Sequence, residues 1–192
     1  MADFTAVLDA SALYSAALRD LVLSLAANDL FRPAWSESIH AEWMRNLIAN
    51  HGGGAAIQAH AAQTRDRMDA TFPDALIDGF QALIAGLTLP DPKDRHVLAT
   101  AIHAGAAVIV TYNLRDFPAS ELAKSGIETW HPDDLVEFLL DAEIDTALDA
   151  IREHRARLRR PAKTQAEYIE MVIDKLNMPR TGQILRTHTA RF

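Results

Sequence analysis

The 192-residue sequence contains no cysteine. Without thiols, the chain can build neither a disulfide framework nor a zinc site based on thiolates. It also lacks an apolar run long enough to span a bilayer, and residues 1–13 lack the basic and apolar regions of a secretion signal. We therefore expect a soluble, cytoplasmic protein that makes no membrane contact.

Positive charge is scarce in the first three quarters of the chain. Residues 1–142 hold 9 Lys and Arg against 19 Asp and Glu, a balance of −10, whereas residues 143–192 hold 10 against 7, a balance of +3. Six basic residues lie close together in the second part: Arg152, Arg155, Arg157, Arg159, Arg160 and Lys163. This basic segment is a candidate contact for a polyanion or an acidic partner, or it neutralises the acidic body.

Strand and helix patterns alternate along the first two thirds of the sequence. Short apolar strand candidates occur at residues 4–8, 32–35, 106–112 and 127–130, and helical patterns separate them. This order predicts an α/β fold in which helices cover both faces of a mainly parallel sheet.

Only helical patterns follow the last strand candidate. We therefore predict one domain over residues 1–142 and a basic helical extension over residues 143–192, packed on the same domain. Near the N-terminus, Ser11 is a candidate cap for a helix that ends near Ala27, and Ser36 is a candidate cap for a helix that ends near Asn50.

The most informative stretch is residues 90–118, PDPKDRHVLATAIHAGAAVIVTYNLRDFP. Asp91 and Pro92 form a typical helix start, and Gly105 is a typical helix end. The apolar, β-branched run that follows is typical of a strand buried on both faces. The strand leads to Asn113 and Asp116 at its C-terminal end, where open α/β sheets place their ligands.

Four acids fall where a parallel sheet could bring them together: Asp9, Glu42, Asp94 and Asp116. Each also has an ordinary structural explanation. Asp9 could close a turn or cap a helix, and Glu42 could pair with Arg45 one helical turn away. Asp94 could act in a capping box with Asp91, and Asp116 could shape a turn or pair with its neighbour.

Together, however, four carboxylates at one sheet edge predict a divalent-metal site. Clustered carboxylates repel one another unless a cation neutralises them, and Mg²⁺ and Mn²⁺ prefer oxygen ligands. One or two such ions can generate hydroxide, orient it in line and stabilise the leaving oxygen of a phosphodiester. Ser11, Thr111 and Asn113 lie near the same edge and are candidates to orient the acids or to hold metal waters.

The histidines show no spacing typical of a metal site. We therefore assign structural or surface roles to His40, His51, His96 and His103.

Three motifs give the chain a resemblance to a known family: VLDASAL at the start, IHAEWMRNL in the second predicted helix, and the long segment from Asp91 to Pro118. Over about residues 5–142 the sequence resembles PIN-domain proteins, and in particular the VapC-type toxins. The resemblance implies a five-stranded parallel sheet in a three-layer α/β/α arrangement. It also implies that Asp9, Glu42, Asp94 and Asp116 are the family's acidic quartet.

The function that the resemblance implies is a metal-dependent endoribonuclease, the toxin of a toxin–antitoxin pair. Mg²⁺ or Mn²⁺ would be the cofactor, RNA the substrate, a small antitoxin the partner, and a homodimer the assembly. Two features depart from the simplest family pattern: Asp91 is an additional acid that could replace or assist Asp94, and the extension is longer than in compact VapC-type toxins.

Alternative functions remain open at this point. An aspartyl-phosphate phosphatase would need a second acid two residues after Asp9, where this chain has Ser11. A receiver domain is disfavoured because no lysine ends a late strand in the expected context. A non-catalytic PIN module that binds RNA or a protein partner is the main alternative. The arginines at positions 155, 157, 159 and 160 are candidate RNA contacts.

Overall fold

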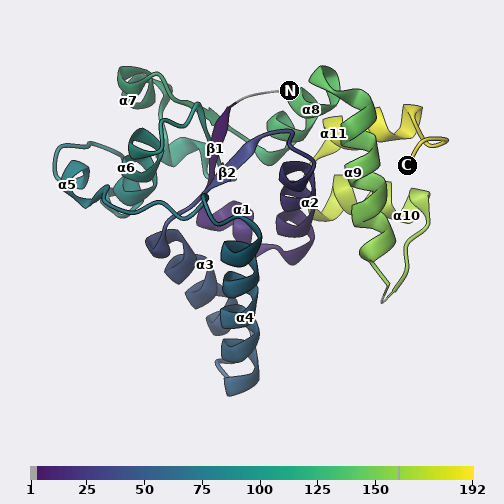
Figure 1. The fold of residues 1–192 in the computed structure, drawn as a ribbon, viewed down its shortest axis with the longest axis horizontal. Helices are drawn as coiled ribbons and strands as arrows, with labels where there is room; N and C mark the ends of the chain where they lie inside the picture. The colour runs from purple at the N-terminus through teal and green to yellow at the C-terminus, as the bar shows by residue number, and fades with distance from the viewer. Residues whose placement is uncertain (1–3, 160) are drawn as a thin grey trace.

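The structure is a computed structural model, and it describes residues 4–159 and 161–192 (Figure 1). Its strands are β1 (Thr5–Leu8), β2 (Arg32–Ala34), β3 (Val108–Val110) and β4 (Glu128–Trp130). The helices of the N-terminal part are α1 (Ala10–Tyr14), α2 (Ala16–Ala27), α3 (Glu37–Asn50), α4 (Ala55–Thr71), α5 (Gln81–Ile84), α6 (Arg95–His103) and α7 (Ala119–Leu122). The C-terminal helices are α8 (Pro132–Ala142), α9 (Ile144–Arg157), α10 (Gln165–Glu170) and α11 (Pro179–Thr187). Short 3-10 turns are η1 (Pro92–Asp94), η2 (Leu114–Asp116) and η3 (Ala123–Ser125), and η4 (Met171–Lys175) is a π-helical turn.

The described residues form a parallel sheet of four strands in the order β2-β1-β3-β4. The expectation of five strands is therefore wrong. At the β2 edge, Trp35 forms a single parallel bridge to Leu76 and exchanges backbone hydrogen bonds with Ala75 and Ile77. Pro73 and Gly79, the latter at a φ of +76°, flank this bridge. These flanking residues disfavour an extension of the bridge into a fifth strand.

The central strands β1 and β3 carry the core of the sheet. Ala6, Val7 and Leu8 are fully buried, and so are Ile109 and Val110. The predicted parallel α/β architecture is thus confirmed, and both central strands end at the same edge, since Leu8 pairs with Val110. Gly105 adopts a φ of +60° and ends α6 before β3, as the sequence predicted.

The N-terminal helix differs from its prediction. Asp9 is the N-cap residue of α1, and α1 ends at Ser15. Ser15 also caps the start of α2, where its side chain accepts a hydrogen bond from the backbone N–H of Leu18. Ser11 lies inside α1 and caps neither helix. Its hydroxyl is therefore available for the contacts at the sheet edge that are described below.

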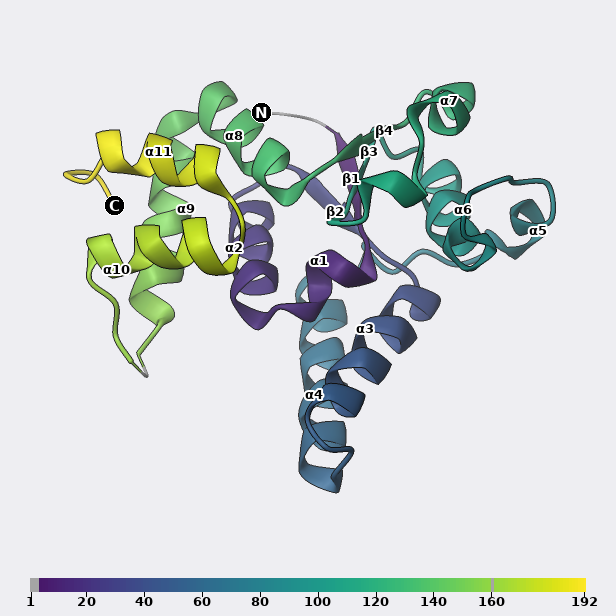
Figure 2. The same cartoon turned by 180° about the vertical axis from the view of Figure 1, so that it is seen from behind.

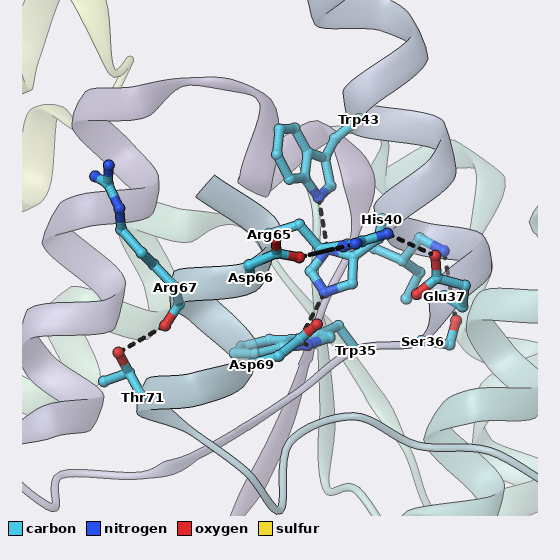
Figure 3. A network of polar contacts seen from close by, with 11 residues as sticks. Trp35, Ser36, Glu37, His40, Trp43, Arg65, Asp66, Arg67, Asp69 and Thr71 are labelled. Atoms are coloured by element: carbon cyan, nitrogen blue, oxygen red, sulfur yellow. Dashed lines mark hydrogen bonds and ion pairs between the residues drawn. The ribbon is translucent and has the colours of Figure 1, made fainter. Parts of the chain in front are cut away.

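Helices α3 and α4 form a pair that projects from the sheet (Figures 1 and 2). Ser36 caps α3 as predicted. A buried polar network joins the two helices, and in it His40 Nε2 lies 3.0 Å from Asp69 Oδ1 (Figure 3). The indole N–H of Trp35 donates to Asp69, and the indole N–H of Trp43 donates to His40 Nδ1. Because Trp43 donates to Nδ1, the proton of His40 is on Nε2 and points to Asp69. His40 thus has the structural role that the sequence predicted.

The C-terminal helices pack on the sheet domain through several contacts. Helix α9 packs on α2, and α8 packs on α9 and α11. Arg180 on α11 forms ion pairs with Asp133, Asp134 and Glu137 of α8. The hydroxyl of Tyr112, just after β3, donates to the carbonyl of Leu176 at 2.7 Å. The extension is therefore anchored to the chain segment that follows β3.

Among the described residues, no helix is both long enough and apolar enough to cross a membrane.

Candidate metal centre

Asp9 is held at the C-terminal end of β1 by two hydroxyl groups. Its Oδ2 atom accepts hydrogen bonds from Ser11 Oγ at 2.7 Å and from Thr111 Oγ1 at 2.8 Å. The two hydroxyls lie 3.0 Å apart, and Ser11 also accepts from the backbone N–H of Tyr112. Because the side-chain hydrogen bonds to this carboxylate within the described residues all fall on Oδ2, the Oδ1 atom keeps its lone pairs for a ligand.

Asp94 and Asp116 lie on short 3-10 turns near the same edge. Asp94 ends η1 and precedes α6, and its side chain makes no capping hydrogen bond. The capping role belongs to Asp91, which accepts from the backbone N–H of Lys93 at 2.9 Å. Asp116 ends η2, and its side chain forms no ion pair with Arg115 within the described residues. The capping role of Asp94 and the pair of Asp116 with Arg115 are therefore not observed among the described residues, whereas Asp116 does lie in a turn.

Glu42 lies on the face of α3 that is turned toward α6. Its Oε2 atom lies 3.4 Å from Nε2 of His96, and the Glu42 side chain is 30% exposed. Within the part of the chain that the structure describes, Glu42 makes no ion pair with Arg45. The carboxylate therefore faces across the space between two helices and does not stabilise α3 locally.

Glu42, Asp94 and Asp116 line a groove with a volume of about 740 Å³, which we call the acidic groove, whereas Asp9 is not one of its lining residues. Its lining residues are Ser38, Ala41, Glu42, Arg45, Asp91, Lys93, Asp94, His96, Asn113 and Asp116. Partial burial and, after it, the negative charges of Asp9, Asp116, Asp91 and Glu42 together raise the pKa of Asp94 to about 6. Asp94 is thus close enough to the other acids to be affected by their charge.

The donor set fits Mg²⁺ or Mn²⁺. All four candidate ligands offer carboxylate oxygens, which these ions prefer, and the pKa of Asp94 is raised first by burial and then by negative charge that a cation would neutralise. Among residues 4–159 and 161–192, no three His, Asp or Glu side chains are already arranged closely enough to hold an ion. Binding would therefore have to draw the carboxylates together against their repulsion.

The remaining predicted residues fall into two places. Asn113 lines the acidic groove, and its backbone N–H donates to Thr111 Oγ1 at 3.0 Å. The basic segment lies at the end of α9, which both views place on the other side of the molecule from α6 (Figures 1 and 2). In that segment Arg155 donates to the carbonyl of Lys163, Arg157 donates to Ser24, and Arg159 is exposed. Arg160 lies outside the described residues.

Sequence reasoning missed His96 as a residue of the groove. Its side chain is 16% exposed, it faces Glu42, and its Nδ1 atom is buried without a hydrogen-bond partner among the described residues. A signal was available, because His96 follows Asp94 by two residues at the start of the helix. Only the packing of α3 against α6 shows which way it points.

Comparisons with known proteins agree with the α/β fold. A model of the PIN domain matches residues 5–115, and a model described as the VapC50 C-terminal domain matches residues 132–187. A curated protein of Mycobacterium tuberculosis (strain ATCC 25618 / H37Rv), named "Putative ribonuclease VapC50", is 49% identical over 63 residues. That match spans 33% of this chain and 35% of the relative, or about a third of its length. No solved structure gives a significant match.

Proposed function

Because the chain belongs to the PIN domain family and lines one groove with acids, we propose that it is a divalent-metal-dependent endoribonuclease. The observation that carries the proposal is the placement of Glu42, Asp91, Asp94 and Asp116 along one groove, with Asp9 near enough for its charge to help raise the pKa of Asp94. Such a cluster is costly unless it serves a cation, and the name of the VapC50 relative points to ribonuclease chemistry.

In this proposal Asp9, Glu42, Asp94 and Asp116 hold Mg²⁺ or Mn²⁺. When bound, the ion lowers the pKa of water and neutralises charge on a phosphodiester. The protein's own residues do the rest. Ser11 and Thr111 fix the orientation of Asp9, and His96 orients Glu42. Arg45 and Lys93 line the groove and supply positive charge that attracts the RNA backbone.

We further propose that the protein is the toxin of a type II toxin–antitoxin pair. The match of residues 132–187 to the VapC50 C-terminal domain supports this, since that part of the chain distinguishes it from a bare PIN domain. A small antitoxin that covers the acidic groove would restrain the enzyme, and a homodimer is the expected assembly. Residues 155, 157, 159 and 160 would contact RNA phosphates away from the groove.

The test is cleavage of pooled cellular RNA by the full chain in the presence of Mn²⁺ or Mg²⁺ and in the presence of a chelator. We expect cleavage only with the metal, and loss of cleavage in the variants Asp9→Ala and Asp94→Asn. The matched control is Asp149→Asn, which removes an exposed acid paired with Arg152 outside the groove.

Two outcomes would contradict the proposal. Cleavage that persists in the chelator would exclude the metal, and cleavage by Asp94→Asn at the wild-type rate would exclude the acidic groove. RNA binding without cleavage under all these conditions would support the alternative of a non-catalytic PIN module.

A further inference from the structure

A second concave site lies between the sheet domain and the extension, at the junction of α2, α4 and α9. It is a cavity of about 540 Å³, a volume typical of small-molecule sites. It shares no lining residue with the acidic groove. We call it the cationic pocket and define it by the charged residues and histidines that line it: Arg19, Asp20, His60, Arg67, His154 and Arg157.

The charge of this pocket is opposite to that of the whole chain. Three arginines line it against one carboxylate, that of Asp20, so its formal charge is 3 − 1 = +2, whereas the chain carries −7. Asp20 is itself engaged, since one of its carboxylate oxygens lies 4.0 Å from Nε of Arg19. The pocket therefore offers an excess of guanidinium donors.

Two of the three arginines are fixed in place by the protein. Arg19 is 4% exposed, donates to the carbonyl of Leu13 at 2.8 Å and lies over the ring of Trp43. Arg157 donates to the hydroxyl of Ser24. An arginine held by one hydrogen bond keeps further N–H donors for a ligand, because its guanidinium carries five.

The third arginine, Arg67, is free. Within the described residues its guanidinium has no hydrogen bond or ion pair, although Arg65 on the same helix pairs with both Glu37 and Asp66. Figure 3 shows Arg67 extending away from the polar network that joins α3 and α4. Its charge is thus directed to the pocket and not to the nearby acids of α4.

His154 supplies an independent sign of a ligand. Its side chain is 1% exposed, and its Nδ1 atom lies 2.8 Å from the hydroxyl of Tyr168, which is not a lining residue. The other ring nitrogen, Nε2, is buried and has no partner among the residues described. A buried polar atom without a partner is costly, and here it belongs to a residue of the pocket wall.

The protonation of His154 suits an anion. Burial, and then the charge of Arg157, lower the pKa of His154 to about 4, so the ring is neutral at physiological pH. Burial keeps the phenol of Tyr168 protonated by raising its pKa. When Tyr168 donates to Nδ1, the single ring proton of His154 is on Nε2, so the unpartnered atom of this lining residue is a hydrogen-bond donor.

From this geometry we propose that the cationic pocket binds a small phosphate monoester. A phosphate monoester carries roughly two negative charges at neutral pH and three acceptor oxygens, which match the +2 charge and the convergent donors of the pocket. A single carboxylate would leave several of these donors unused. Leu23, Met68 and Phe72 also line the cavity and form an apolar wall for the organic part of the ester. The proposal does not depend on nuclease activity.

The test is calorimetric titration of the full chain with phenyl phosphate in a chelator without divalent ions. Inorganic phosphate and phenol serve as comparison probes, because they separate the contribution of the phosphate from that of the apolar wall. We expect one saturable site per chain for phenyl phosphate, weaker binding of inorganic phosphate and none of phenol. The NMR signals of the His154 ring should shift on binding.

Matched variants distinguish the pocket from general charge effects. Arg67→Gln removes an exposed arginine with no partner, and it should weaken binding about tenfold or more. Arg65→Gln removes the same charge from the same helix outside the pocket and should leave binding unchanged. Asp94→Asn in the acidic groove should also bind phenyl phosphate like the wild type.

Several results would overturn the proposal. They are the absence of saturable binding at millimolar phenyl phosphate, equal losses in Arg65→Gln and Arg67→Gln, and a change of affinity in Asp94→Asn. A cavity that holds only water would give the first of these results. None of them bears on RNA cleavage, so this proposal and the nuclease proposal can fail separately.

Discussion

The hydroxyl of Thr111 donates to Oδ2 of Asp9 at 2.8 Å, although the two residues are 102 positions apart in the sequence. The contact joins the ends of the neighbouring strands β1 and β3, and Thr111 is fully buried. It leaves one carboxylate oxygen of Asp9 free and fixes the direction in which that oxygen points.

Our first prediction concerns this contact. Thr111→Val keeps the shape of the side chain but removes the hydroxyl, so Asp9 loses a positioning hydrogen bond. We expect Mn²⁺ affinity to fall roughly 10- to 100-fold, as is typical when a partner of a metal ligand is removed. The measurement is calorimetric titration with Mn²⁺.

Thr129→Val is the matched control, because Thr129 lies on β4 and donates to the carbonyl of Phe117, not to an acid. Its Mn²⁺ affinity should equal that of the wild type. If Thr111→Val lowers only the melting temperature and leaves Mn²⁺ affinity unchanged, the hydroxyl is structural and does not position Asp9.

The second prediction concerns the charge of Asp94. The pKa of Asp94 is ordinarily 3.8 and is about 6 in the folded protein. At pH values between these two, the folded state therefore binds more protons than the unfolded state. Stability therefore falls as the pH rises from about 4 to about 6. Asp94→Asn should remove this cost and stabilise the metal-free protein at neutral pH by about 1 kcal/mol, because solvent screens the half-buried carboxylate. That gain corresponds to roughly 2–4 °C in melting temperature.

The gain should disappear in two conditions. Below pH 3.8 wild-type Asp94 is protonated, so the melting temperatures of the two proteins should converge. With Mn²⁺ present the wild type should become the more stable protein, because only it keeps all four ligands. A melting difference that is independent of both pH and metal would show that the carboxylates of the groove do not interact.

The third prediction separates the two acids of the DPKD turn. Asp91 caps η1 through the backbone of Lys93, whereas Asp94 makes no capping bond. Asp91→Ala should therefore cost about 0.5–2 kcal/mol of unfolding free energy with a modest loss of cleavage. Asp94→Ala should abolish cleavage without destabilising the fold. Loss of cleavage only in Asp91→Ala would make Asp91 the ligand.

The sequence was sufficient to predict the parts of the fold that depend on local pattern. The run that contains Ile109 predicted a buried strand, Ser36 predicted a helix start, and Gly105 predicted a helix end, and the structure contains all three. The number of strands was wrong because the fifth came from the family resemblance and not from a strand pattern. Here the chain offers only the bridge from Trp35 to Leu76.

Features that depend on packing between distant segments could not be predicted. Asp9 at the strand end and Ser11 were both candidate caps, and the local sequence does not decide that Asp9 caps α1. The pair of Glu42 with His96 arises only where α3 meets α6, and His154 becomes buried only where α9 packs on α2. The assignment of four acids as metal ligands stays a prediction.

The fourth prediction concerns the close approach of α11 to η4 in the extension. A Cβ atom at Gly182 would lie 2.7 Å from Cδ1 of Ile173 and nearer still to its Cγ1. In a helix, Gly→Ala usually stabilises, but here the overlap should dominate and destabilise the protein by about 1–3 kcal/mol. Chemical denaturation measures the change.

Two comparisons test the cause of that loss. Ile173→Ala combined with Gly182→Ala should recover part of the stability, because the added methyl group then has room. Gly86→Ala should have little effect, since the nearest atom to its Cβ would be the Leu83 carbonyl oxygen at 3.7 Å. A stable Gly182→Ala single variant would show that η4 can move away from α11.

The last prediction concerns the arginines at positions 155, 157, 159 and 160. If they contact RNA phosphates, each lost contact should reduce the salt slope of single-strand binding by about 0.7. The quadruple substitution to Gln should therefore weaken RNA affinity and flatten its salt dependence while the metal requirement stays the same. Arg155 and Arg157 also form hydrogen bonds within the protein, so the melting temperature of this variant must be measured alongside.

The single variant Arg159→Gln is the sharper version of this experiment, because Arg159 is exposed and lines neither the cationic pocket nor the acidic groove. It should reduce the salt slope of RNA binding by about 0.7, the value for one phosphate contact, and leave both the melting temperature and phenyl phosphate binding unchanged. The end of α9 lies on the other side of the molecule from α6, so cleavage at saturating RNA should also be unchanged (Figure 2). An unaltered salt slope in the quadruple variant would exclude RNA contact by this segment and leave it a role in packing or in binding a protein partner.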